Sequence, residues 1–293
     1  MIEVRDVRKS YDKVEILHGL SFDIKKGRVH AFLGRNGAGK TSFIRGFMDV
    51  FKFDSGTITI DGKPFDPKDY KMGYLPEERG MYQKVPILDQ LLYFSSLRGI
   101  DEKKAKDNIM DLLTRLGLGD KAKDKLMTLS KGNQQKVQLI QALMNEPDII
   151  ILDEPFSGLD PVNSEILMDL VKDIMTEDAY MIFSSHQMSY VEDICQDITM
   201  IDHGSIVLDG EIDEIKREMG SERLRIQAPD ETYEALKKAG YKLENLGNKL
   251  IIDPEDGTKE ELLAFMVKEG LSFDSLGDYL PSLSEIYIET VGD

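Results

Sequence analysis

The chain has 293 residues, enough for one large domain with a small one or for two domains of medium size. Its formal net charge of -17 repels nucleic acids and anionic lipid surfaces at long range, so we expect no nucleic-acid partner. Cys195 is the only cysteine, which excludes an internal disulfide and a cysteine metal site and is typical of a reducing compartment.

The N-terminus is charged from Glu3 onward, and no apolar run reaches the roughly 18 residues that a membrane span needs. The sequence therefore predicts neither a signal peptide nor a transmembrane helix, and we expect a cytoplasmic chain. Cys195 is expected to be a small buried side chain rather than a reactive thiol.

The first 65 residues combine short strands with a glycine-rich loop. Alternating apolar residues predict strands at 2–7, 17–24 and 57–65, the last of them ending in a hairpin. Between them, the apolar segment 28–33 leads into the loop "GRNGAGKT", and apolar residues at helical spacing follow in 41–51. Strand, loop and helix thus follow one another directly.

The middle of the chain alternates helices and strands. Residues 80–147 are predicted to be a helical subdomain. The next segment, "DIIILDEP" at 148–155, predicts a strand that is covered on both faces. Further strands at 179–185 and 198–210, with a helix at 161–175, predict a parallel α/β sheet that carries an antiparallel edge and a helical insertion.

A change in character near Gly220 predicts that residues 1–220 form one domain and 221–293 another. The second segment holds 8 Lys or Arg against 16 Asp or Glu. Its signals follow the order β-α-β-β-α-β of a ferredoxin-like domain and end in a helix at 281–290. This small α+β accessory domain carries no recognisable catalytic group.

The loop "GRNGAGKT" at 34–41 has the composition and the context of a phosphate-binding loop. Its three glycines allow the backbone amides to turn inward, Lys40 neutralises the β and γ phosphates, and Thr41 offers its hydroxyl to Mg²⁺. The residues predicted to contact the nucleotide here are Arg35, Asn36, Gly37, Ala38, Gly39, Lys40, Thr41 and Ser42.

Two acids stand at the carboxyl end of the apolar strand, where open α/β sheets bind ligands. We assign Asp153 to the magnesium shell and Glu154 to the general base that takes a proton from the attacking water. A buried structural pair is the alternative, at the cost of burying charge without partners. His186 ends the next strand and could reach the γ-phosphate from the same edge, although a histidine alone is more often structural.

With these motifs in place, residues 1–220 resemble the ATPase subunit of ATP-binding cassette (ABC) transporters. The matching elements occur in the family's order: Tyr11, "GRNGAGKT", "YLPEERG" at 74–80, "LSKGNQQ" at 129–135, "IIILDEP", "SGLD" at 157–160 and "SSH" at 184–186. The resemblance implies a P-loop NTPase with a RecA-like parallel sheet core and an antiparallel β subdomain. The tail is similar to an acidic C-terminal extension of one bacterial, exporter-type branch.

The resemblance also implies an ATP hydrolase that pairs head to tail with a second copy or a homologous ATPase subunit. The signature around Ser130 and Gly132 would then grip the ATP of the neighbouring subunit, and Asp160 would lie at the same interface. Tyr11 would stack on adenine. The signature residues implicated in this way are Ser130, Lys131, Gly132, Asn133 and Gln134. Ser130 could otherwise be a simple helix N-cap.

Two positions depart from the family pattern. The signature usually reads Ser-Gly-Gly-Gln, whereas Lys131 and Asn133 replace its second and fourth members here. Lys131 either adds positive charge near the neighbour's phosphate or points to solvent. The lid loop usually presents glutamine to magnesium, and Glu77 occupies that position, so we expect Glu77 as a third magnesium contact after Thr41 and Asp153.

Three functions are open at this point. The first is a cassette that hydrolyses ATP with Mg²⁺ and drives a separate integral membrane permease, which would hold it at the inner face of the cell membrane and serve export. The second is a non-transport ABC ATPase that acts on ribosomes or nucleic acid, against which the acidity counts. In the third, the tail senses a ligand or holds the dimer together.

Overall fold

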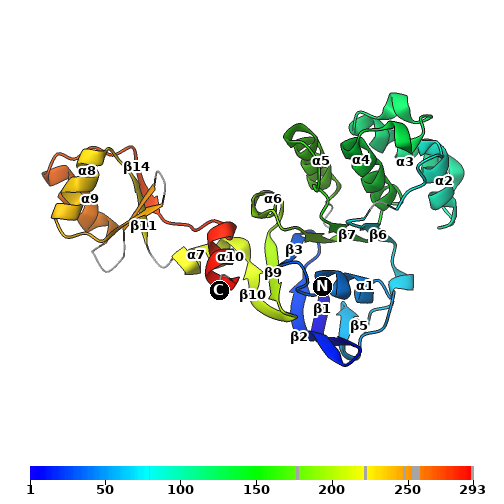
Figure 1. Ribbon diagram of the computed structural model, residues 1–293, viewed down its shortest axis with the longest axis horizontal. Helices are drawn as coiled ribbons and strands as arrows, with labels where there is room; N and C mark the ends of the chain where they lie inside the picture. Colours follow the sequence, from blue (N-terminus) through cyan, green and yellow to red (C-terminus); the bar gives the residue numbers. More distant parts are fainter. Residues whose placement is uncertain (79, 176–177, 221–222, 247–248, 253–257, 292–293) are drawn as a thin grey trace. The chain divides into compact units, whose positions relative to one another are not determined.

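The computed structural model describes residues 1–78, 80–175, 178–220, 223–246, 249–252 and 258–291 (Figure 1). The chain forms two compact units, Met1–Glu211 and Ile212–Asp293. The sequence predicted this boundary at residue 220, whereas the structure has it after Glu211. The physical reason is that helix α7 (Ile212–Gly220) packs against helix α10 (Leu283–Val291) of the second unit.

In the described part of the first unit, a six-stranded sheet has the order β10-β9-β3-β8-β7-β6. All neighbours are parallel except β9 and β10, which form an antiparallel edge hairpin. The strands are β3 (Val29–Gly34), β6 (Met72–Leu75), β7 (Ile149–Asp153), β8 (Tyr180–Ser184), β9 (Asp197–Asp202) and β10 (Ser205–Glu211). Strands β3, β7 and β8 are buried along their whole length, as expected for central parallel strands.

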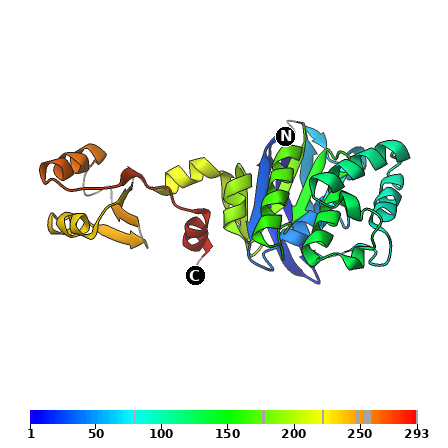
Figure 2. The same ribbon diagram turned by 90° about the horizontal axis from the view of Figure 1, so that it is seen from above.

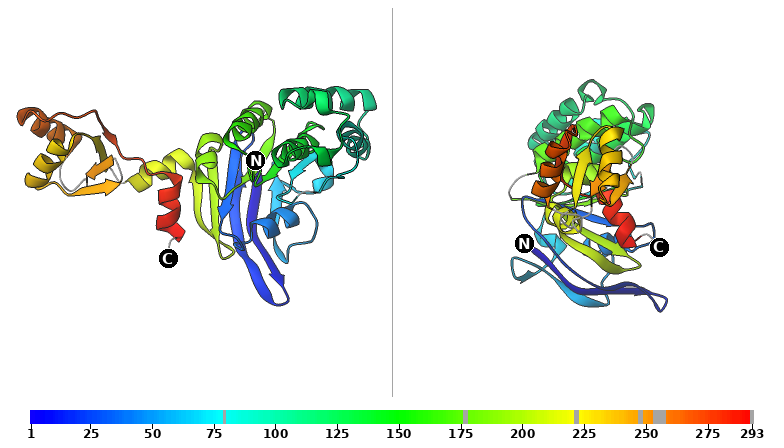
Figure 3. Two further views of the ribbon diagram at one scale, coloured as in Figure 1. Left: turned by 45° about the horizontal axis from the view of Figure 1, so that its top comes forward. Right: turned by 90° about the vertical axis from the view of Figure 1, so that its left-hand side faces the viewer.

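A second, antiparallel sheet of the first unit has the order β2-β1-β4-β5 within the described residues. Its strands are β1 (Ile2–Tyr11), β2 (Val14–Ile24), β4 (Ser55–Ile60) and β5 (Lys63–Pro64). Strands β1 and β2 form one long hairpin, which Figure 3 shows in blue. Asp12 and Lys13 turn it with positive φ values of 47° and 72°, as a two-residue hairpin turn requires.

The core of the first unit lies between its two sheets, where helix α1 (Lys40–Phe47) is enclosed (Figure 1). Phe22, Phe32 and Phe43 meet there with ring centroids 5.0–5.4 Å apart, and every one is buried. Phe32 belongs to β3 and Phe43 to α1, so this aromatic packing holds both ends of the loop that connects the strand to the helix.

Helices α4 (Lys131–Leu143) and α5 (Pro161–Ile174) lie on the other face of the parallel sheet (Figure 1). Helices α2 (Ile87–Ser96) and α3 (Glu102–Arg115) join α4 in the helical insertion, at the end of this unit away from β10 (Figure 2). The buried residues of α3 are Ala105, Ile109, Leu112 and Leu113. The short elements are η1 (Pro67–Asp69), η2 (Gly119–Lys121), η3 (Leu126–Thr128) and α6 (Met188–Ile194).

The second unit contains a four-stranded antiparallel sheet in the order β12-β13-β11-β14, within the residues described. Helices α8 and α9 cover one face of this sheet (Figures 1 and 3). The elements are β11 (Leu224–Gln227), α8 (Asp230–Lys238), β12 (Leu243–Leu246), β13 (Lys249–Ile252), α9 (Lys259–Lys268) and β14 (Ser275–Asp278). This is the order of a ferredoxin-like fold, so the predicted fold class is confirmed for both parts.

No helix among the described residues is long and apolar enough to span a bilayer. Cys195 is buried, as predicted, with 7% of its surface exposed.

Candidate nucleotide site

The loop between β3 and α1 has the backbone that phosphate binding needs. Gly37 and Gly39 have φ values of 84° and 109°, which only glycine adopts without strain. A Cβ on Gly39 would also lie 2.7 Å from Leu17 Cδ2. Gly34 serves packing instead, because a Cβ there would lie 2.4 Å from the carbonyl oxygen of Ile201. These glycines lead directly into the N-terminus of α1, where backbone amides suit an anion.

Lys40 is held by this loop. Only 8% of the residue is exposed, and its Nζ donates to the carbonyl oxygens of Gly34 and Arg35 over 2.6 and 3.3 Å. Burial lowers the pKa of Lys40, while the nearby carboxylates of Glu154, Asp153 and Glu77 act to raise it. The loop thus holds a buried cation next to the three acids that were predicted to act with it.

Asp153 is the last residue of β7, and Ser184, the last residue of β8, lies beside it in the sheet. The Ser184 hydroxyl donates a hydrogen bond to Asp153 Oδ1. Burial raises the pKa of Asp153, and the bond from Ser184 opposes that rise. Ser184 bonds only one of the two carboxylate oxygens, and within the described residues Asp153 Oδ2 has no hydrogen bond.

Glu154 follows directly but is aimed differently, because its φ of 52° turns the chain at this residue. It is 7% exposed, and its Oε1 lies 2.9 Å from His186 Nδ1. Ser185 donates to Oε2 over 3.4 Å. Burial raises the pKa of Glu154, and the contact with His186 opposes that effect. Most of the His186 side chain is exposed, so it joins a buried carboxylate to solvent.

The signature residues form a second group. Ser130 caps α4 by accepting a hydrogen bond from the Asn133 amide over 3.3 Å, and Gln134 Nε2 donates to the Leu129 carbonyl over 3.1 Å. Gly132 lies against Leu159, since a Cβ on it would be 3.2 Å from the Leu159 side chain. The signature therefore packs on the "SGLD" loop.

Asp160 ends that loop and caps α5. Its carboxylate accepts from the Asn163 backbone amide over 3.0 Å, a bond that lowers the pKa of Asp160. Among the described residues, no hydrogen bond or ion pair joins Asp160 or residues 130–134 to the phosphate loop at 34–41. Within one chain, the phosphate loop and the signature are therefore separate groups.

Three other predicted contacts are exposed. Tyr11 ends β1 with 43% of its surface exposed, and its ring packs edge-on against Phe51 at 5.7 Å. Lys131 is exposed at the start of α4, and Glu77 is exposed in the loop after β6. Of these, Glu77 lies close enough to affect the pKa values of both Lys40 and Asp153.

Comparison with known proteins shows to which family the chain belongs. A family described as "ABC transporter" matches residues 17–157. The chain is 36% identical over 296 residues to the uncharacterized ABC transporter ATP-binding protein YhaQ of Bacillus subtilis, covering 100% of this chain and 99% of YhaQ. The chain belongs to the ABC transporter ATP-binding proteins. This family hydrolyses ATP to drive transport, and the family predicted from the motifs is confirmed.

Further relatives cover the cassette. NatA, an ABC transporter ATP-binding protein of B. subtilis, is 34% identical, over 76% of this chain and 95% of NatA. The solved ATP-binding subunit of an ABC transporter has a TM-score of 0.69 at 27% identity, over 75% of this chain and 93% of that one. Residues 210–291 match the C-terminal domain of DrrA1-3-like ATP-binding proteins, which begins close to the observed unit boundary.

Two contacts of this ABC cassette were not predicted from the sequence. Ser184 and Ser185 bond the two acids, and their signal was a pair of small polar residues at the end of a buried strand. Gln138 is buried on α4, where its Nε2 lies 3.5 Å from the Glu78 carbonyl oxygen. Its signal was a polar residue on the buried side of an amphipathic helix. Gln138 connects the signature helix to the lid loop.

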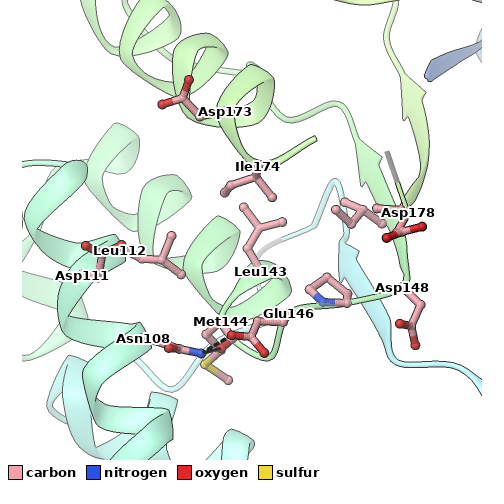
Figure 4. Close-up of a pocket in the computed structure, with 13 residues that line it drawn as sticks. Asn108, Asp111, Leu112, Leu143, Met144, Glu146, Asp148, Asp173, Ile174 and Asp178 are labelled. Carbon is pink, nitrogen blue, oxygen red and sulfur yellow. Dashed lines mark hydrogen bonds between the residues drawn. The ribbon is translucent and has the colours of Figure 1, made fainter. Parts of the chain in front are cut away.

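A different pocket, of about 400 Å³, lies at the opposite, amino ends of β7 and β8 (Figure 4). Asp111, Glu146, Asp148, Asp173 and Asp178 surround its apolar floor. So many carboxylates repel the phosphates of a nucleotide. This pocket is therefore poorly suited to a nucleotide.

Proposed function

We propose that Glu154 is the general base for ATP hydrolysis and that His186 positions it. The 2.9 Å contact between their side chains is the observation that carries the proposal. Burial raises the pKa of Glu154 toward the range where a carboxylate is an effective base. Glu154 takes a proton from water as that water attacks the γ-phosphorus, and the bond from phosphorus to the β-γ bridging oxygen breaks to release ADP and phosphate.

The other residues predicted to act around the phosphate loop suit ATP with Mg²⁺. Lys40 and the amides of the loop bind the β and γ phosphates, and Tyr11 offers an exposed ring face to adenine. Thr41, Asp153 and Glu77 would hold Mg²⁺, which commonly takes one or two protein carboxylates together with substrate phosphates. Bound there, the ion neutralises charge that develops on the phosphates.

Hydrolysis takes place in a head-to-tail pair. Gly132 lies against Leu159 of the "SGLD" loop, and among the described residues neither it nor Ser130 bonds the phosphate loop of its own chain, which supports a role toward the ATP of a neighbour. The amides and the dipole at the start of α4 suit the γ-phosphate. Asp160, Lys131, Asn133 and Gln134 would belong to the same interface. The partner is a second copy or a homologous subunit.

The cassette drives a membrane permease that docks beside the lid loop. A groove of about 400 Å³ in the first unit supports this, because β6, the lid loop, α2 and α4 all line it. Leu97 lines it with 66% of its surface exposed, and Phe94 lies beside it. The relatives include the linearmycin resistance ATP-binding protein LnrL at 31% identity, which supports export as the direction.

Steady-state ATP turnover tests the catalytic proposal. Glu154→Gln should lower kcat about 10²- to 10⁴-fold while ATP binding persists, because the base is lost and the shape is kept. Glu165→Gln, an exposed position on α5, is the matched control and should keep the normal rate. Normal turnover by Glu154→Gln would overturn the assignment.

Mixing two inactive variants tests the head-to-tail arrangement. Lys40→Ala removes the phosphate grip, and Ser130→Glu places a negative charge in the signature. Each variant alone should be inactive. A mixed pair has one intact site, made from the phosphate loop of one chain and the signature of the other, so mixing should restore turnover. No recovery in mixed dimers would contradict a shared site.

Tagged protein purified from detergent-solubilised host membranes tests the permease. We expect stoichiometric multi-span proteins, identified by mass spectrometry. Leu97→Glu should lose them, whereas Val50→Glu should retain them, because Val50 is equally exposed but lies outside the groove. Recovery of soluble partners alone would move the function away from transport.

A further inference from the structure

The second unit contains a basic pocket of about 760 Å³. It is lined from α7, from the starts of β11 and α9, and from the end of β14. Its cationic members are Lys216, Arg217, Arg223 and Lys259. Pockets of this volume commonly hold small ligands. We call this site the basic pocket.

The basic pocket carries mostly cationic side chains, whereas residues 221–293, which form most of the pocket, are acidic overall. Residues 221–293 have twice as many acids as bases. Among the described lining residues, four basic side chains face two acids, Asp213 and Asp278. An acidic unit that places these four cations around one cavity creates a local positive site, although the surrounding charge repels anions at longer range.

Arg223 is fixed within the basic pocket. Its guanidinium carbon lies 4.8 Å from the centre of the buried Tyr279 ring, and its side chain donates to the carbonyl oxygens of Gly220 and Met219 over 3.4 and 3.3 Å. Stacking on an aromatic ring holds the planar fork in one orientation. Arg223 therefore forms a rigid wall of the pocket.

Arg217 and Lys259, two cations of the basic pocket, differ in the interactions of their side chains. Lys259 pairs with Asp278 over 3.4 Å in an exposed contact. Arg217 is exposed on α7, and within the described residues its side chain has no hydrogen bond or ion pair. A guanidinium offers five donors in a fork that matches the oxygens of phosphate. Arg217 thus brings unused donors to a cavity with one preorganised arginine.

We propose that the basic pocket binds a phosphate group, carried either by a soluble phosphorylated compound or by an anionic lipid headgroup. Arg217 supplies the charge-assisted hydrogen bonds, and the stacked Arg223 sets the position of the group. Asp213 and Asp278 in the lining favour a ligand of low charge over a polyphosphate. The site is independent of ATP hydrolysis, so failure of the catalytic assignment would leave it standing.

Tryptophan fluorescence of the full chain can report on the pocket, because the sequence contains no tryptophan. Leu280→Trp places a reporter at the pocket, where Leu280 is 55% exposed. The experiment uses the Lys40→Ala background, which removes the phosphate grip of the cassette. The probes are glycerol 3-phosphate, for the soluble source, and co-sedimentation with vesicles of phosphatidylglycerol against pure phosphatidylcholine, for the lipid source.

Arg217→Ala should weaken binding about tenfold, because it removes charge-assisted hydrogen bonds to phosphate. Arg225→Ala is the matched control, since Arg225 is exposed on β11 and lies outside the pocket. Equal thermal midpoints would establish that both variants fold.

A response to glycerol 3-phosphate that depends on Arg217 assigns the soluble source. Arg217-dependent binding to phosphatidylglycerol vesicles alone assigns the lipid headgroup. Either result supports the proposal. Binding of neither probe, or equal effects of Arg217→Ala and Arg225→Ala, would overturn it.

Discussion

The hydrogen bond from Ser184 to Asp153 allows a controlled measurement, because the cassette offers two buried serines in opposite states. Ser184 is fully buried and donates to the buried Asp153 carboxylate. Ser164 is 2% exposed, and its Oγ has no partner among the described residues. The change Ser→Ala removes the same atom at each position, so the difference between the variants isolates the bond.

The two changes should affect the free energy of unfolding differently. A hydrogen bond to a charged group contributes about 1.5–3 kcal/mol, so Ser184→Ala should lower the free energy of unfolding by about 2 kcal/mol. Loss of the bond also lets the pKa of Asp153 rise further, since Ser184 opposes the effect of burial. Ser164→Ala removes a hydroxyl that is buried without a bond, so it should be neutral or stabilising by about 1 kcal/mol.

Urea denaturation followed by far-ultraviolet circular dichroism, without nucleotide, measures both values for the cassette transition. Nucleotide is omitted because ligand binding adds its own stabilisation. Ser184→Ala should also need more Mg²⁺ for half-maximal turnover, whereas Ser164→Ala should not. Equal losses of stability in the two variants would refute the reasoning.

Three further predictions concern titration and packing. His186→Ala removes the contact that lowers the pKa of Glu154. In a plot of kcat against pH, the acidic limb should therefore move to higher pH. If that limb does not move, a group other than Glu154 produces it. Burial lowers the pKa of His30 from 6.5 to about 4. The unfolded chain then binds the proton more readily, so stability is complete above pH 6.5 and falls by about 1.4 kcal/mol per pH unit toward pH 4. His30→Gln should flatten that slope in denaturation curves, and parallel slopes would exclude His30 as the source. Gly39→Ala should lower the free energy of unfolding by about 2–4 kcal/mol, because it adds backbone strain and a close contact with Leu17. Gly99 also has a positive φ but has open space around it, so Gly99→Ala should lower the free energy of unfolding by only about 1–2 kcal/mol. Equal losses in urea denaturation would show that the contact with Leu17 relaxes.

Much of the fold and the placement of the candidate site followed from local sequence. The phosphate loop could be located because strand, glycines and helix are contiguous, and Asp153 because it ends an uninterrupted apolar strand. The ferredoxin-like order could be predicted because each element has its own periodicity. These signals need no knowledge of distant residues.

Long-range packing limited the rest. The assignment of α7 to the second unit depends on α10, which comes much later in the chain. The Ser184 bond depends on the register of β7 against β8, and the basic pocket depends on four separate elements meeting. None of these pairings has a local signal, so the sequence alone could not provide them.

The position of β3 also sets the order in which the protein can mature during synthesis. Its sheet partners are residues 181–183 of β8 and 197–201 of β9, so the strand that ends in the phosphate loop waits for segments made much later. Until then, the apolar residues of β3 lack their neighbours and are exposed to aggregation. A nascent chain should therefore acquire nucleotide binding late and abruptly, once β9 has left the ribosome.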